Sequence, residues 1–282
     1  SVLVAIKSMA TRLEIISFER IRDEFIKILM SPSPRIGITV LVETGLADYF
    51  LPEVPKLKLE IDEHHHHKDV YEHSLTVLEQ AIGLESRLDG PNLTLRLAAL
   101  LHDIGKPKTK QLIAGSGVSF HHHEVVGARM CKERMKKLRF DNHMIEDVSQ
   151  LVFLHLRFHG YGSGEWTDSA VRRYVRDAGP LLTHLHLLTR ADCTTRNKKK
   201  AESLAKTYDQ LEERIALLME QEELDKIRPD LSGEEIMQIL AIKPSPTVGK
   251  AYDFLLELRL EKGPIGKEAA TAELLTWWKG QN

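Results

Sequence analysis

The stretch LAALLHDIGKPKT, Leu97–Thr109, predicts an apolar helix that ends on a His-Asp pair. Gly105 and Pro107 follow directly and are typical helix stop signals. Neighbouring residues on a regular helix point about 100° apart, but the last turn can relax and aim both His102 and Asp103 at one ion. The carboxylate can also bridge two ions. For an isolated pair, a helix-terminal histidine beside a solvated aspartate is the simpler interpretation, because short motifs match easily.

Two further residues support a metal site. His73 lies in VYEHSLTVL, where its neighbours at helical spacing are apolar, so we expect it to face inward. Asp192 ends an apolar helix in LLTRADCTTRN, and a carboxylate in such a place needs a partner or an ion. Together with His102 and Asp103 they supply nitrogen and oxygen ligands for one metal ion.

Two more histidines extend this ligand set. His123 begins HEVVGARM, and Gly127 lies four residues later, where helices could pack closely. His155 stands on an otherwise apolar face in DVSQLVFLHLRFHG. With Asp103 as a bridge, the enlarged set is sufficient for two ions.

The remaining histidines are harder to place. The run His64–His67 precedes the helix that begins after Asp69, in a segment where successive side chains diverge, so no fixed coordination geometry is implied. We interpret the run as a rim that offers phosphate or adventitious metal contacts. Three others stay open as substitute ligands because each lies close to a predicted one: His121, His122 and His159.

Helical periodicity dominates the rest of the chain. FERIRDEFIKILM, Phe18–Met30, places its apolar residues on one face, and SGEEIMQIL opens with a capping box formed by Ser232 and Glu235. Only TKQLIAGSGVSFHH, Thr109–His122, reads as a β-hairpin. The pattern therefore predicts an all-α fold.

Composition limits the class of protein. The 282 residues are 42% hydrophobic and 28% charged, with a net charge of -2, so any nucleic-acid surface must be local. The two cysteines are far apart and give neither a disulfide framework nor a Cys-based zinc site. Neither a signal peptide nor an apolar run of membrane-spanning length is evident, so we expect a cytoplasmic protein with no membrane partner.

Two basic runs are candidates for a local nucleic-acid surface. CKERMKKLRF, residues 131–140, fits a solvated helix face. TTRNKKK follows Asp192 and so lies beside the predicted site. Together with the resemblance to a tRNA-binding family that is described below, this position implies contact with an RNA backbone. We expect no base reading there, because aromatic residues do not interleave the charges. The predicted RNA-binding residues are Arg196, Lys198, Lys199 and Lys200.

The order and spacing of these residues, and the context LLHDIGK, resemble the HD superfamily of metal-dependent phosphohydrolases. His123 and His155 match the extra histidines of its two-metal members. The resemblance implies Asp103 as a catalytic residue and Lys106 as a phosphate-facing cation. The implied metal ligands are His73, His102, Asp103, His123, His155 and Asp192.

The flanking segments resemble another family. The residues around ERIRDE, Glu19–Glu24, are similar to the neck of bacterial CCA-adding enzymes and poly(A) polymerases, the tRNA nucleotidyltransferase family, some of which carry an HD domain behind the neck. This resemblance implies a neck at residues 1–58, an HD domain at 59–212 and a helical tail at 213–282. The nucleotidyltransferase head of that family is not found here, so the chain by itself is expected not to add CCA or poly(A), and Mg²⁺ is expected only with a head.

The predicted chemistry is metal-assisted phosphoester hydrolysis in tRNA 3′-end processing. The histidine-rich ligand set favours one or two Mn, Fe, Co or Ni ions. The resemblance implies a small phosphoester or 2′,3′-cyclic nucleotide as substrate, at a tRNA or RNA 3′ end. The alternative is a non-catalytic tRNA-binding neck, body and tail whose metal site is structural or vestigial. The sequence does not indicate an oligomeric state.

Overall fold

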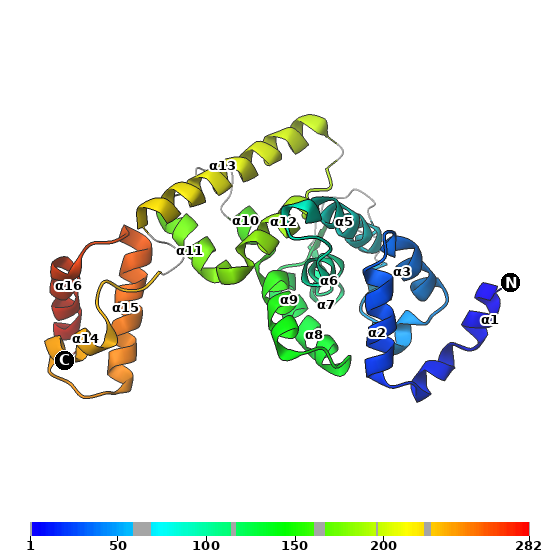
Figure 1. The fold of residues 1–282 in the computed structure, drawn as a ribbon, viewed down its shortest axis with the longest axis horizontal. Helices are drawn as coiled ribbons and strands as arrows, with labels where there is room; N and C mark the ends of the chain where they lie inside the picture. Colours follow the sequence, from blue (N-terminus) through cyan, green and yellow to red (C-terminus); the bar gives the residue numbers. More distant parts are fainter. Residues whose placement is uncertain are drawn as a thin grey trace. The chain divides into compact units, whose positions relative to one another are not determined.

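The computed structural model describes residues 2–58, 69–113, 117–160, 167–195, 197–222 and 227–281. It confirms the all-α fold (Figure 1). The chain forms two compact units, Ser1–Gly160 with Pro180–Ala205, and Tyr161–Gly179 with Lys206–Asn282. The three-part division at residues 58 and 212 remains a prediction.

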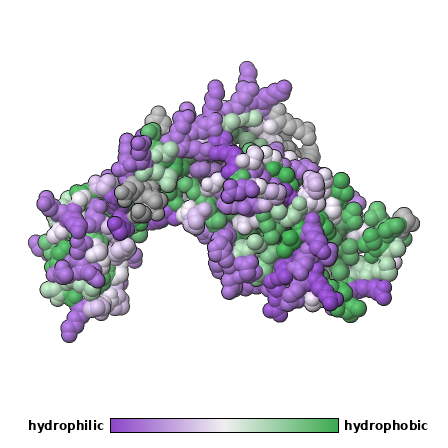
Figure 2. Space-filling model, in the orientation of Figure 1, coloured by the Kyte–Doolittle hydropathy of each residue, from purple (hydrophilic) through white to green (hydrophobic). Residues whose placement is uncertain are grey.

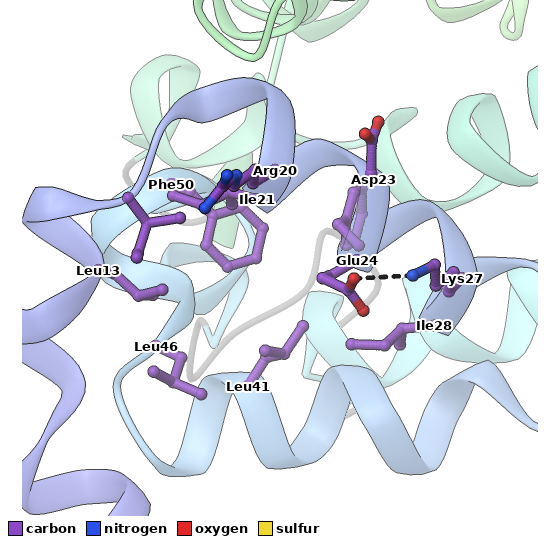
Figure 3. A pocket seen from close by; sticks show the side chains of 12 residues that line it. Leu13, Arg20, Ile21, Asp23, Glu24, Lys27, Ile28, Leu41, Leu46 and Phe50 are labelled. Atoms are coloured by element: carbon purple, nitrogen blue, oxygen red, sulfur yellow. Dashed lines mark hydrogen bonds and ion pairs between the residues drawn. The ribbon is translucent and has the colours of Figure 1, made fainter.

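The first unit opens with short helices around α2. They are α1 (Val2–Ser8), η1 (Ala10–Ile15), α2 (Phe18–Leu29), α3 (Pro34–Glu43), α4 (Ala47–Phe50) and η2 (Pro55–Leu57). Between η1, α2, α3 and α4 lies an apolar pocket of about 860 Å³ (Figure 3). Phe25 and Leu41 line it, and the ion pair between Lys27 and Glu24, 2.7 Å long, lies at its edge. None of its lining residues belongs to the predicted metal site.

The rest of the first unit carries the predicted ligands. Its elements are α5 (Val70–Leu84), η3 (Glu85–Arg87), α6 (Leu93–Leu101), α7 (Lys106–Thr109), β1 (Gln111–Ile113), β2 (Gly117–Ser119), α8 (His123–Lys137), α9 (Asn142–Leu154), α10 (Arg157–Gly160), η4 (Gly179–Leu181, which begins at the unit boundary) and α12 (Leu182–Asp192). The two strands pair antiparallel with Leu112 opposite Val118, so the predicted hairpin is confirmed.

Helix α6 forms the centre of this unit. Leu95 and all residues from 96 to 101 are buried, and α6 contacts α5, α9 and α12. Asn92 begins the helix because its side-chain oxygen accepts a hydrogen bond from the Leu95 amide at 2.9 Å. Asp69 caps α5 in the same way through the Tyr71 amide, as its position suggests. A helix buried on all sides carries the residues at its end into the core.

One charged residue of α6 is nevertheless buried. The Arg96 side chain is 4% exposed and forms a two-pronged ion pair with Glu85, with both nitrogen–oxygen distances 2.7 Å. Its remaining terminal nitrogen donates to the carbonyls of Leu29 and Ser31, at 2.8 and 3.0 Å. Arg96 therefore attaches α6 to the last turn of α2.

The second unit comprises α11 (Asp168–Ala178), most of α13 (Lys198–Glu222), α14 (Gly233–Leu240), α15 (Pro246–Lys262) and α16 (Lys267–Lys279). The last three pack around Ile236, Leu255 and Leu274, which are almost fully buried. The predicted capping box at Ser232 and Glu235 is confirmed, since each side chain accepts a hydrogen bond from the other's backbone amide.

Among the described residues, the helices are too short or too polar to cross a membrane. Several apolar side chains near the start of the chain are exposed, among them Val2 at 76% and Val4 at 66%, and others are exposed elsewhere, such as Leu112 at 80% (Figure 2).

Candidate metal centre

The His-Asp pair lies in the core at the end of α6. His102 follows the last helical residue, and both His102 and Asp103 are 1% exposed. The turn after them packs tightly on α8: a Cβ atom on Gly105 would clash with the His123 carbonyl oxygen and lie 2.7 Å from the Gly127 amide nitrogen. The predicted close approach at Gly127 is confirmed. The two glycines let the His-Asp turn reach the start of α8.

Four other helix ends bring the remaining predicted residues to the same place. His73 lies in the first turn of α5, His123 is the first residue of α8, His155 follows the last residue of α9, and Asp192 ends α12. The ring centroids of His102 lie 5.3 Å from those of His73 and His155. The His123 and His155 rings are also 5.3 Å apart. The structure therefore brings all six predicted ligand residues together.

These residues form two sets. In each set the potential ligand atoms lie within 4.8 Å of one another; one set is His73, His102 and Asp192, and the other is Asp103, His123 and His155. Asp103 connects them, since one oxygen lies 3.2 Å from His102 Nε2 and the other 3.3 Å from His123 Nε2. The Nε2 atom of His73 lies 2.9 Å from an oxygen of Asp192. This geometry is compatible with the predicted bridging role of Asp103.

Backbone carbonyls set the orientation of three imidazoles. The Nδ1 atoms of His102, His123 and His155 lie 2.9, 2.9 and 2.6 Å from the carbonyl oxygens three residues earlier. A carbonyl only accepts, so Nδ1 must donate, and in the neutral ring Nε2 is left with its lone pair. Metal-binding histidines are commonly oriented in this way.

A fourth contact was not predicted. His73 Nδ1 lies 3.2 Å from the hydroxyl oxygen of Thr194. The signal that could have suggested it is local, because Thr194 follows Asp192 by two residues in ADCTTRN. The segment at the end of α12 thus supplies both a potential ligand, Asp192, and a hydrogen-bond partner for His73, which is Thr194.

Asp103, which is buried, and Asp192, which is 13% exposed, create a strongly negative potential at the site. Burial opposes protonation of His102, but Asp103 and Asp192 outweigh it and raise the pKa of His102 to about 10. Burial, together with the charge on His102, lowers the pKa of His155 to about 3. Burial would favour the neutral form of Asp103, yet His102 and Lys106 hold its pKa well below the usual value. A proton on His102 or a bound cation can compensate this negative charge.

The donor set fits a metal ion. His123 Nε2 is buried and has no hydrogen-bond partner among the described residues. Such a nitrogen is costly to leave without a partner, and a cation would provide one. Imidazole and carboxylate ligands together suit first-row transition metals.

The structure also separates the other candidates. His121 and His122 are exposed whereas His123 is 5% exposed, so His123 is the one of the three that lies in the cluster with Asp103 and His155. Lys106 places Nζ 3.0 Å from Asp103 and 5.7 Å from the centre of the Phe120 ring. The side chain of His159 and the run at residues 64–67 lie outside the described residues.

Three of the four predicted RNA-binding residues lie on α13. Lys198, Lys199 and Lys200 are exposed in its first turn, whereas Arg196 lies outside the described residues. The amide of Lys200 donates to the side chain of Asn197 at 3.2 Å, which caps the helix. The lysines follow Asp192 along the chain and belong to the same unit.

Comparison with known proteins identifies both parts of this unit. Residues 1–57 match the model of a probable RNA and SrmB-binding site of polymerase A, and residues 70–197 match the HD domain. The chain is 31% identical over 98% of its length to an A-adding tRNA nucleotidyltransferase of Deinococcus radiodurans, of which the match covers 62%. It is 32% identical over 93% of its length to a CC-adding tRNA nucleotidyltransferase of Thermus thermophilus, of which the match covers 57%.

A shorter match, 35% identical over 51% of the chain, is to 33% of a multifunctional CCA protein of Neisseria meningitidis. The chain thus spans about three fifths of the length of the first two relatives. The matches follow the order of the elements described above, with the polymerase region before the HD domain. The chain therefore belongs to the tRNA nucleotidyltransferase and poly(A) polymerase family, of which it represents the polymerase A RNA-binding region followed by an HD domain.

Proposed function

We propose that the chain is a metal-dependent phosphohydrolase that acts on phosphoesters at the 3′ end of tRNA or a related RNA. The convergence of six ligand-type side chains from five helix ends is the observation that carries this proposal. The family relationship favours tRNA as the partner.

In this proposal His73, His102 and Asp192 hold one ion, and Asp103, His123 and His155 hold a second or contact a phosphate oxygen. A divalent ion held there would supply an acidified water as nucleophile and would offset phosphate charge. The donor types favour Mn, Fe, Co or Ni.

Two residues have catalytic roles in the proposal. Asp103 orients the site because its two oxygens contact different histidines. Lys106 lies 3.0 Å from Asp103, so its ammonium group is positioned to attract a phosphate oxygen. The exposed side chains of Lys198, Lys199 and Lys200 would contact the RNA backbone without reading its bases.

Metal content and activity test the proposal together. The wild-type chain is expected to bind one or two Mn, Co or Ni ions and to hydrolyse a phosphomonoester or a 2′,3′-cyclic nucleotide when they are added. Asp103→Ala is expected to lose both properties. Asp89→Ala, at an exposed aspartate of the same unit, is the matched control and should retain both. Wild-type protein that binds metal but hydrolyses neither substrate would contradict the proposal.

The second candidate is a non-catalytic tRNA-binding module. The match of residues 1–57 to a probable RNA-binding region favours it. It predicts that Asp103→Ala binds a tRNA transcript as tightly as the wild type and that neither hydrolyses the small substrates. The two candidates therefore differ in the activity measured, not in RNA binding.

A further inference from the structure

The cations in the last two turns of α8 divide into two groups. Lys132 and Arg134 are neutralised by acidic residues of the same unit: Lys132 lies 2.5 Å from Glu146, and Arg134 lies 2.8 Å from Glu53. Lys136 and Lys137 are exposed and form no ion pair within the described part of the chain. The positive charges of residues 131–140 are therefore only partly neutralised by acidic neighbours, so the run is more than the simple solvated face expected from the sequence.

The unpaired group meets α2. Lys137 places Nζ 5.2 Å from the centre of the Phe18 ring, and the Arg22 guanidinium donates to the carbonyl oxygen of Arg139. This contact joins the N-terminal half of α2 to the end of α8. We call the resulting surface the α8 corner, which consists of Arg22, Lys136, Lys137 and Arg139.

Two carboxylates face the α8 corner. Glu19 lies 3.8 Å from Arg139, with side chains 53% and 68% exposed, and Asp23 lies 2.8 Å from Arg22. The exposed pair of Arg139 with Glu19 contributes little to stability, so a phosphate can compete for Arg139. The surface of this region is hydrophilic (Figure 2).

The backbone of Arg139 is the most informative feature. Helix α8 ends with paired hydrogen bonds, from the Phe140 amide to the Met135 carbonyl and from the Arg139 amide to the Lys136 carbonyl. This Schellman ending places Arg139 at φ 60°, a position that glycine usually occupies because a Cβ atom is strained there. The arginine thus adopts an unfavourable conformation, while its carbonyl contact to Arg22 would be available to glycine as well.

We propose that the α8 corner is a second RNA-binding surface, which holds backbone phosphates of the same RNA whose 3′ end the metal centre acts on. This proposal rests on the proposed function, which supplies both the RNA partner and the site of its 3′ end. Arginine and lysine side chains at an exposed helix end suit phosphate contacts. Strain at Arg139 is then explained by the need for its guanidinium.

The test measures binding of a fluorescent tRNA transcript to the full chain over a range of salt concentrations. Each lost phosphate contact should weaken binding about fivefold near physiological salt and reduce the salt slope by about 0.9. Arg139→Gly should therefore bind about fivefold more weakly, and Lys136→Ala combined with Lys137→Ala about 25-fold more weakly. Lys132→Ala is the matched control, because Glu146 already neutralises Lys132 on the same helix.

Arg139→Gly also separates binding from folding. Its melting temperature is expected to equal or exceed that of the wild type, because glycine relieves the strain, so weaker RNA binding would not come from unfolding. Variants that bind RNA with unchanged affinity and salt slope would overturn the proposal. The same result is expected if the α8 corner binds a protein instead of RNA.

The metal-dependent activity keeps the two proposals distinguishable. Hydrolysis of a small phosphoester should be unchanged in the α8 corner variants, because the substitutions lie outside the metal centre. If the wild-type chain binds no RNA, both the proposed RNA partner and the proposed RNA-binding role of the α8 corner are contradicted. If the wild type binds RNA and the variants bind it equally well, only the proposed role of the α8 corner is contradicted.

Discussion

Replacing Arg96 by alanine is expected to destabilise the first unit by about 4 kcal/mol. The side chain is 4% exposed and its partner Glu85 is 7% exposed, so removal of the arginine leaves a carboxylate buried without its charge partner. Breaking such a pair costs about 3–5 kcal/mol. The carbonyls of Leu29 and Ser31 lose their donor at the same time.

Urea unfolding followed by circular dichroism measures this loss. Hydrogen exchange of peptides from α6 locates it, with peptides from α15 in the other unit as an internal reference. Lys132→Ala is the control for an ion pair at the surface, with side chains 39% and 62% exposed, and should cost less than about 1 kcal/mol.

A double variant separates the charge from the packing. Arg96→Met with Glu85→Leu removes both charges, so it should be less destabilised than Arg96→Ala although it is altered at two positions. A loss below about 1 kcal/mol for Arg96→Ala, or a double variant worse than the single one, would refute the reasoning.

Three further predictions concern separate features. Gly105→Ala should lower the free energy of unfolding by about 1–3 kcal/mol, measured in urea, because the added Cβ overlaps the His123 carbonyl; an unchanged midpoint would contradict this packing. Only Cys193 should react rapidly with a thiol reagent at pH 8, because burial raises the pKa of Cys131 to about 12. Rapid modification of two thiols per chain would contradict this prediction. The hydrogen bond from Lys267, together with the capping contact, lowers the pKa of Glu235 from 4.5 to about 2. Its contribution is present above pH 4.5 and is lost towards pH 2, so thermal melts should show Glu235→Gln less stable than wild type at pH 7 but not at pH 2.

The convergence of the ligand residues could be predicted because each is a polar residue in an otherwise apolar helical segment. Burial of a histidine or aspartate in such a segment requires a partner, and His73, His102 and Asp192 can be recognised on this basis. The order of these residues along the chain supplied the rest through a family resemblance. Their roles as metal ligands remain predictions.

Other features depend on geometry that periodicity does not contain. The hydrogen bonds from Nδ1 to the carbonyl three residues earlier require knowledge of where each helix ends, to the residue. Arg96 reads as an ordinary polar position in LTLRLAALL, since its partner Glu85 lies eleven residues earlier in a different element. The strained backbone of Arg139 likewise has no signal in CKERMKKLRF.

The interleaving of the two units has a consequence for how the protein is made. The first unit needs Pro180–Ala205, which emerges from the ribosome only after the whole of Tyr161–Gly179, a part of the second unit. Until Asp192 is synthesised, α12 cannot complete the core around α6, and the set His73, His102 and Asp192 has two members instead of three. A cut after Ala205 leaves the first unit whole but takes α11 away from the second, so no single cut yields both units intact.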